Sequence, residues 1–206
     1  MKMSSTPEKI VEVTRQLFAS QGVENTSVRQ IASAAGVNIA AINYHFGGRD
    51  NLVKTIFEMF IRALDEKRDA LLAEAKKNAG KNAIGVRAVV VAHLRPWIDF
   101  KQEHPELMPI FRDFVNKKYQ PDLSYKTIVQ QKTEEVYGQF LSLVGESLPG
   151  IPETILKKRI HIAISMALSM LLIQWLPERL SEISGLPMTN DTFIDDIVAL
   201  IEGNLT

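Results

Sequence analysis

Apolar residues recur at the three- and four-residue spacing of amphipathic helices through most of the chain, without the period-two alternation of half-buried strands. The first such segment begins after Ser5, which can form a capping box with Glu8, and stops at Gly22. Its apolar positions fall on one face: Ile10, Val13, Leu17 and Phe18. The pattern therefore predicts an all-α protein whose first helix covers residues 6–21.

Two shorter helices follow, separated by a tight glycine turn. The first starts at Ser27, with Gln30 three residues further on as a second capping box, and stops at Gly36. The second covers only about residues 38–44, so packing must hold it in place. Its expected anchors are Ile42 and Phe46. This arrangement has the size of a helix-turn-helix motif.

A long helix is predicted from about residue 49, because apolar residues recur at every fourth position: Leu52, Ile56, Phe60 and Leu64. Further helices are expected over residues 84–103, 105–116, 122–147, 153–176 and 190–204, where prolines and glycines set the breaks. Pro96 lies inside the first of these and predicts a kink or break. We expect two domains, residues 1–55 and 56–206, linked by the long helix.

Composition and charge exclude several classes of protein. The 206 residues carry 24 Lys and Arg against 24 Asp and Glu, so DNA binding must come from a local arrangement and not from bulk charge. The absence of cysteine excludes disulfides and thiolate chemistry. The first residues lack a signal segment, and the longest apolar stretch, residues 162–173, is too short to span a membrane. We expect a cytoplasmic protein with no metal, cofactor or membrane partner.

The short second helix of the motif has an uncharged outer face. The face carries small or amide side chains, which suit contact with thymine methyl groups and adenine edges: Asn38, Ile39, Ala41 and Asn43. Groups suited to phosphates flank this helix: Ser27, Arg29, Tyr44, His45 and Arg49. Residues 1–55 carry a local charge of about +2, which has the sign that DNA binding requires.

Several stretches form a specific pattern: Leu17-Phe18, Gly22, residues 26–32, Ala35-Gly36-Val37, and Tyr44-His45-Phe46-Gly47 through Leu52. Through them, residues 9–57 resemble the DNA-binding domain of TetR-family (tetracycline-repressor-type) regulators. Position by position, the resemblance implies phosphate contacts from Ser27, Tyr44, His45 and Arg49. It implies base contacts from Arg29, Ile39, Ala40, Ala41 and Asn43. Gly48 and Arg49 depart from the Ser and Lys that are common in the family, and Arg keeps the charge while changing its geometry.

The resemblance also implies a homodimer and a C-terminal domain that binds a small ligand. Residues 137–140 and 148–161 resemble a subgroup that responds to fatty acids, which implies a fatty acid or acyl derivative as effector. The candidate pocket residues are Leu94, Trp97, Ile98, Phe111, Phe114, Tyr137, Phe140, Leu141 and His161. These are also ordinary core types, and His161 is equally a core or interface histidine. His93 and His104 are expected at the surface or at helix ends.

The helix predicted over residues 153–176 is apolar on nearly every side, with Met166, Met170 and Trp175 in one stripe. Such a helix must bury two faces, either in the domain core or in a two-fold interface shared with the helix over residues 190–204. The candidate dimer contacts are Met166, Met170, Leu172, Ile173, Ile197, Leu200 and Ile201.

The combined interpretation is a ligand-responsive transcriptional regulator, a repressor that a small hydrophobic effector releases from a palindromic operator. One alternative is a DNA-binding dimer without an effector, which keeps the first four helices but needs no cavity. A second alternative is an enzyme, although no nucleophile–base pair, paired carboxylates or metal-ligand spacing is visible in the sequence.

Overall fold

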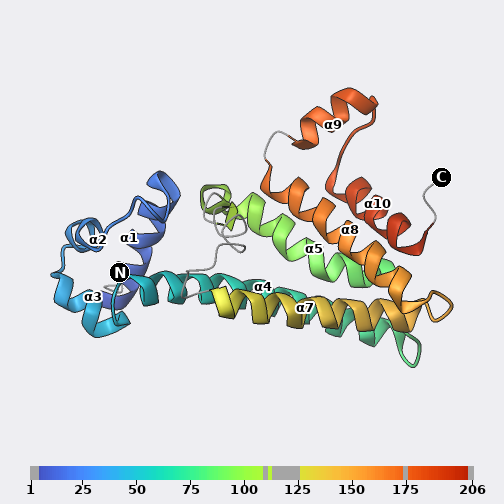
Figure 1. The fold of residues 1–206 in the computed structure, drawn as a ribbon, viewed down its shortest axis with the longest axis horizontal. Coiled ribbons are helices and arrows are strands. Elements are labelled where there is room, and N and C mark those ends of the chain that lie inside the picture. The colour runs from blue at the N-terminus through green and yellow to red at the C-terminus, as the bar shows by residue number, and fades with distance from the viewer. Residues whose placement is uncertain (1–4, 109–110, 113–125, 174–175, 204–206) are drawn as a thin grey trace. The chain divides into compact units, whose positions relative to one another are not determined.

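Helices make up all the regular secondary structure in the described part of the chain, which confirms the predicted all-α fold (Figure 1). The computed structural model describes residues 5–108, 111–112, 126–173 and 176–203. The elements are α1 (Thr6–Gln21), α2 (Val28–Ala35), α3 (Ile39–Phe46), α4 (Arg49–Ala79), α5 (Val86–Glu103), the 3-10 helix η1 (Pro105–Leu107), α7 (Lys126–Ser147), α8 (Glu153–Leu172), α9 (Leu176–Ser184) and α10 (Asn190–Glu202).

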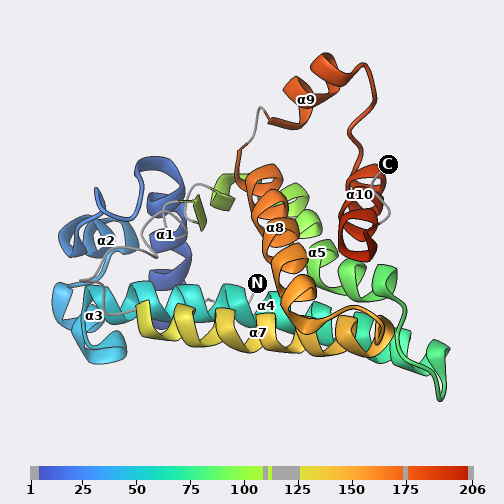
Figure 2. The same ribbon diagram turned by 45° about the vertical axis from the view of Figure 1, so that its right-hand side comes forward.

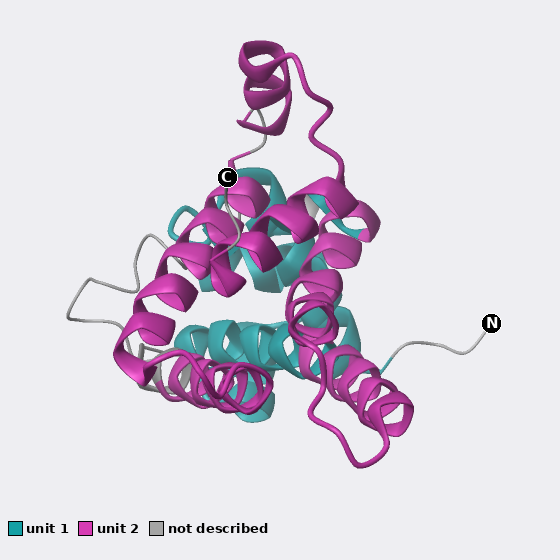
Figure 3. Cartoon of the chain, turned by 90° about the vertical axis from the view of Figure 1, so that its right-hand side faces the viewer, with its two compact units in different colours: residues 1–63, 104–130 teal, residues 64–103, 131–206 magenta. Residues whose placement is uncertain are grey.

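The chain divides into two compact units (Figure 3). Unit 1 consists of residues 1–63 and 104–130, and unit 2 consists of residues 64–103 and 131–206. The division between residues 63 and 64 falls inside α4, so one continuous helix belongs to both units.

Local capping interactions set the helix starts in unit 1. The backbone N–H of Ser5 donates to the Glu8 carboxylate at 2.9 Å, and the backbone N–H of Ser27 donates to Gln30 Oε1 at 2.8 Å. Both predicted capping boxes are therefore present. The apolar faces of the helices meet in a core that includes Ile10, Phe18, Ile31, Ile42 and Leu52, each almost completely buried.

Unit 2 is built around a continuous apolar core in which α10 packs against both α5 and α8 (Figure 2). Buried residues of α10 fill this core: Phe193, Ile194, Ile197 and Ile201. Polar contacts reinforce the packing. Arg87 of α5 donates to the Asp195 carboxylate at 3.0 Å, and Arg159 of α8 donates to the backbone carbonyl of Ile201 at 3.0 Å.

Some predicted boundaries differ from the structure. The helix expected over residues 153–176 ends at Leu172, because Ile173 is extended, and α9 then begins at Leu176. Pro177 lies in the first turn of α9, where a missing N–H costs nothing, so it marks a helix start and not an end. α5 continues through Pro96 without a break. Of the helix expected over residues 105–116, the structure describes η1, residue 108 and residues 111–112, and the remainder lies outside the described residues.

His93 is buried, which contradicts its expected place at the surface. It is only 8% exposed, and its ring packs edge-on against Phe140 with 4.6 Å between centroids. Its Nδ1 lies 2.8 Å from the backbone carbonyl oxygen of Val89. Burial, with a smaller contribution from the charge of Arg68, lowers the pKa of His93 to about 4 despite the opposing hydrogen bond. His93 is therefore neutral at physiological pH.

We predict that His93 makes the free energy of unfolding decrease as the pH falls from about 6.5 to about 4. The folded chain resists protonation at His93, whereas the unfolded chain binds a proton at the ordinary pKa of 6.5. The stability that depends on neutral His93 is complete above this range and declines by roughly 2–3 kcal/mol across it. Urea unfolding of the wild type and of His93→Phe, which keeps an aromatic ring without a titrating group, measures the difference. An identical pH dependence in the two proteins would contradict the prediction.

Candidate nucleic-acid interface

The turn between α2 and α3 is set by a glycine in the left-handed region. Gly36 has φ 64° and ψ 36°, a conformation that a residue with a β-carbon rarely adopts. Its N–H donates to the carbonyls of Ala32 and Ser33, which closes the end of α2. Asn38 then caps α3, because its side-chain oxygen accepts from the backbone N–H of Ala41 at 2.8 Å. The helix-turn-helix geometry is thus encoded locally.

One fully buried residue holds α3 against the core of unit 1, and the opposite face of the helix is exposed. Ile42 is completely buried, whereas Ala40, Asn43, Tyr44 and His45 are exposed. Tyr44 is 85% exposed, and its ring meets the His45 ring edge-on with 5.0 Å between centroids. The other two face residues, Ile39 and Ala41, are half-buried. The predicted base-reading side chains of α3 therefore lie at the surface of unit 1, and none of these carries a charge.

Two predicted DNA contacts are also helix caps. Ser27 accepts from the backbone N–H of Gln30 at 3.3 Å and donates its hydroxyl to Gln30 Oε1 at 2.7 Å. Asn38 uses its carbonyl oxygen at the start of α3 and keeps its amide nitrogen for other contacts. Arg29 is exposed in the first turn of α2. These caps hold the amino ends of both helices at the surface.

Arg49 joins the start of α4 to the loop that precedes α2. Its Nε donates to the backbone carbonyl of Thr26 at 2.8 Å, and its Nη2 donates to the backbone carbonyl of Val23. Thr26 is buried and donates its own hydroxyl to the carbonyl of Gly22 at 2.8 Å. Sequence reasoning did not predict this bridge, since it joins residues more than twenty positions apart. Arg49 thus acts as a structural bridge, whatever contact it makes with phosphate.

The predicted ligand-pocket residues do not all gather in one place. Six of them pack in or against the core of unit 2: Leu94, Trp97, Ile98, Tyr137, Phe140 and Leu141. Phe111 belongs to unit 1, where its ring packs against Phe57 and Phe60. His161 is exposed on α8, and Phe114 lies outside the described residues.

A surface pocket of about 370 Å³ lies where α7 meets α8 in unit 2. Its lining consists of Gly138, Leu141, Ser142, Gly145, Leu148, Pro149, Ile151, Glu153 and Leu156. Leu141 is the one predicted pocket residue among them. Its two glycines lie about two turns apart on α7 and leave space that larger side chains would fill.

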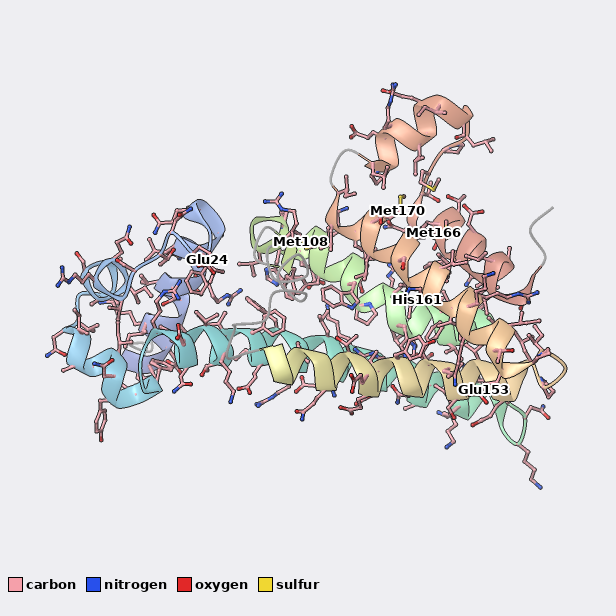
Figure 4. The ribbon with its side chains drawn as sticks, in the orientation of Figure 1. Glu24, Met108, Glu153, His161, Met166 and Met170 are labelled. Atoms are coloured by element: carbon pink, nitrogen blue, oxygen red, sulfur yellow. The ribbon has the colours of Figure 1, made fainter. Side chains whose placement is uncertain are left out.

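The predicted dimer contacts separate into a buried group and a more accessible group. Met170, Ile197 and Ile201 are buried in the core of unit 2, because α8 and α10 turn these residues toward each other and toward α5. Leu172 and Leu200 are half-buried. Met166 and Ile173 are exposed, together with Ile155 and Ile162, which were not predicted. Figure 4 labels Met166 and the buried Met170 on α8. Trp175 lies outside the described residues.

Within the described ranges, no group of three His, Asp or Glu side chains is placed to hold a metal ion. No single helix there has the length and hydropathy to cross a membrane, and α8 with α9 passes that test only as a bent pair.

The helix order and the capped turn define a helix-turn-helix fold, and comparison with known proteins identifies its family. A sequence profile described as "Bacterial regulatory proteins, tetR family" matches residues 10–56. A second profile, "Tetracyclin repressor-like, C-terminal domain", matches residues 91–203, more than half of the chain. The chain belongs to the TetR family. Regulators of this family bind DNA and form dimers.

Individual relatives match over short segments. YttP of Bacillus subtilis is 40% identical over 65 residues, which cover 30% of this chain and 31% of YttP. AcrR of Shigella flexneri is 43% identical over 54 residues, which cover 26% of this chain and 25% of AcrR. The matched segments thus span a third or less of each relative. Both proteins are named as transcriptional regulators and not as enzymes.

Solved structures match the fold over nearly the whole chain. The ketosteroid transcriptional regulator KstR2 of Mycobacterium tuberculosis has a TM-score of 0.62 at 15% identity, and the match covers 100% of this chain and 97% of that one. AmtR of Mycobacterium smegmatis has a TM-score of 0.63 at 14% identity, and the match covers 98% and 88%. At such low identity, these matches establish the fold alone.

We predict that Arg49→Lys lowers the free energy of unfolding by roughly 1–2 kcal/mol, because one ammonium group cannot replace the guanidinium that reaches two carbonyls. Arg29→Lys is the matched control, since Arg29 is exposed on α2. Urea unfolding of the three proteins measures the effect. Equal stability of the two variants would show that the bridge does not stabilise unit 1.

Proposed function

We propose that the protein is a transcriptional repressor that binds a palindromic operator as a homodimer. The observation that supports this function most strongly is the exposed, uncharged face of α3, held by a capped helix-turn-helix. A helix with this surface can enter a major groove without placing a charge against base edges. The match of residues 10–56 to the TetR regulatory profile and the sequence similarity to a named regulator add support.

Each residue of the interface has a proposed role. Arg29, Ile39, Ala40, Ala41 and Asn43 approach bases, with Asn38 at the edge of the same face. Ser27, Tyr44, His45 and Arg49 contact phosphates. The positive end of the α2 dipole favours the phosphate position beside Ser27.

Dimer formation is proposed through the outer face of α8. Its exposed apolar residues, Ile155, Ile162 and Met166, recur at intervals of seven and four, so they form one stripe along the helix. The exposed Ile173 follows directly after the end of α8. An exposed stripe of this kind on a chain of this family fits a two-fold contact with a second copy.

Ligand response is proposed to pass through α4, the helix that belongs to both units. A small, largely apolar effector bound in unit 2 would favour one position of α4 over another. A shift of a few ångströms in the separation of two α3 helices would break their match to successive major grooves. The coupling is limited by the difference in the effector's affinity for the two states.

We predict that Tyr44→Phe weakens binding to all DNA sequences about tenfold, because one hydroxyl contact to phosphate is lost. Asn43→Ala instead changes the preference between bases by about 1–3 kcal/mol. Fluorescence anisotropy with DNA from upstream of the protein's own gene measures both effects. Lys77→Ala, at the other end of α4, is the control and leaves affinity unchanged. A wild-type protein that binds none of this DNA would rule out the proposed function.

We predict that Met166→Glu converts the dimer into monomers, because it places a charge in the proposed apolar contact. Met59→Glu is a closely matched control, since Met59 is 46% exposed and Met166 is 44% exposed. Sedimentation velocity of both variants measures the effect. A Met166→Glu protein that stays dimeric would exclude the outer face of α8 as the interface.

A further inference from the structure

Two polar side chains in unit 2 are more than nine-tenths buried and keep an atom without a hydrogen-bond partner. Arg68 of α4 is 6% exposed, and His93 of α5 is 8% exposed. Among the described residues, no group pairs with Arg68 Nε or with His93 Nε2. An unpaired buried polar atom is costly, so each one indicates a missing partner.

The unpaired atom of Arg68 is a hydrogen-bond donor. Its Nη1 lies 2.6 Å from one oxygen of Asp65, and Lys132 of α7 lies 2.8 Å from the other. Asp65 therefore has two cationic partners and does not reach Arg68 Nε. Because a guanidinium nitrogen can only donate, the open position at Nε–H requires an acceptor.

The unpaired atom of His93 is a hydrogen-bond acceptor. Its Nδ1 lies 2.8 Å from the carbonyl oxygen of Val89, and only a protonated nitrogen can make that bond. The ring is neutral, so Nε2 carries a lone pair and no proton. Nε2 therefore requires a donor.

The two side chains lie near the same helix. Arg68 reaches α7 through Asp65 and Lys132, and His93 reaches it through the edge-on contact with Phe140, about two turns further on. α4 and α7 run side by side in both views (Figures 1 and 2). The charge of Arg68 is close enough to contribute to the lowered pKa of His93. An unpaired donor on α4 and an unpaired acceptor on α5 thus both lie beside α7.

We propose that Arg68 Nε and His93 Nε2 together bind the hydroxyl group of an otherwise apolar effector. This inference rests on the proposed function, and it identifies the chemical class of the molecule. A hydroxyl oxygen accepts from Arg68 while its proton goes to His93, so one group satisfies both side chains. A carboxylate or ketone offers acceptors alone and leaves His93 unpaired. An ammonium offers donors alone and is repelled by Arg68.

A buried water can also accept a hydrogen bond from Arg68 and donate one to His93, so water is the competing occupant of this position. A water bound permanently at this position would make the pair structural, with no role in ligand recognition. The test must therefore detect displacement by an alcohol and not only occupancy.

The direct test uses the wild-type protein and two probes of equal chain length, decan-1-ol and decanoate. Long-range proton–nitrogen NMR of the histidine rings follows His93 Nε2, and thermal unfolding follows stability. We expect decan-1-ol to shift the Nε2 resonance and to raise the melting temperature, with decanoate much weaker in both respects. No response to decan-1-ol, meaning a bound water only, overturns the proposal. A stronger response to decanoate also overturns it.

Variants test each atom separately. His93→Phe removes the acceptor and keeps the ring against Phe140, and Arg68→Met removes the donor. Each should weaken decan-1-ol binding about tenfold, the usual effect of losing one buried hydrogen bond. Arg179→Met, on the exposed surface of α9, is the control and should bind decan-1-ol as the wild type does. Unchanged affinity in His93→Phe or Arg68→Met contradicts the proposal.

Operator binding separates this inference from the function on which it rests. A protein that binds its operator but gives no His93 response to decan-1-ol refutes the hydroxyl site and leaves the proposed repressor intact. A protein that responds to decan-1-ol at His93 but binds no operator refutes the repressor and leaves the site intact.

Discussion

The direction of α3 depends on two consecutive backbone constraints, the left-handed turn at Gly36 and the side-chain cap from Asn38. Together they start the helix at a defined angle after α2, and the buried Ile42 fixes its rotation. Ile42 is the one fully buried residue of α3, so the face that carries Ala40, Asn43 and Tyr44 stays exposed. The exposed uncharged surface follows from this geometry, and the proposed recognition of DNA follows from the surface.

Arg49 and α4 extend this local order to the rest of unit 1. The guanidinium holds the loop before α2 against the first turn of α4, and α4 continues without a break into unit 2. A helix shared by two compact units can report events in one unit to the other, provided that two positions of the helix have similar free energy. The unpaired donor and acceptor of Arg68 and His93 supply a chemical reason for a ligand to bind beside that helix.

Local signals in the sequence were sufficient to predict the motif. Capping residues such as Ser27, and glycines such as Gly36, act within a few positions of themselves, so their effects are visible without a tertiary structure. The long helix from residue 49 was predicted for the same reason, because Leu52, Ile56 and Leu64 repeat on one face and are all buried. The exposure of Asn43 and Tyr44 followed from the position of Ile42.

Features that depend on distant neighbours were not predictable in this way. The position of a side chain on its own helix does not indicate whether another helix will pack over it. The burial of Arg68 and His93 was therefore not predicted from the sequence. Ile197 and Ile201 are of a residue type that is common in interfaces, and only the packing of α10 on α5 and α8 shows that the chain buries them itself.

Selection of binding sites from a random DNA library shows whether α3 reads duplex DNA as one of a pair. We expect enrichment of one two-fold symmetric site whose half-sites lie about one helical turn apart or a multiple of it. Recovery of no common sequence, or of a single unpaired half-site, would contradict it.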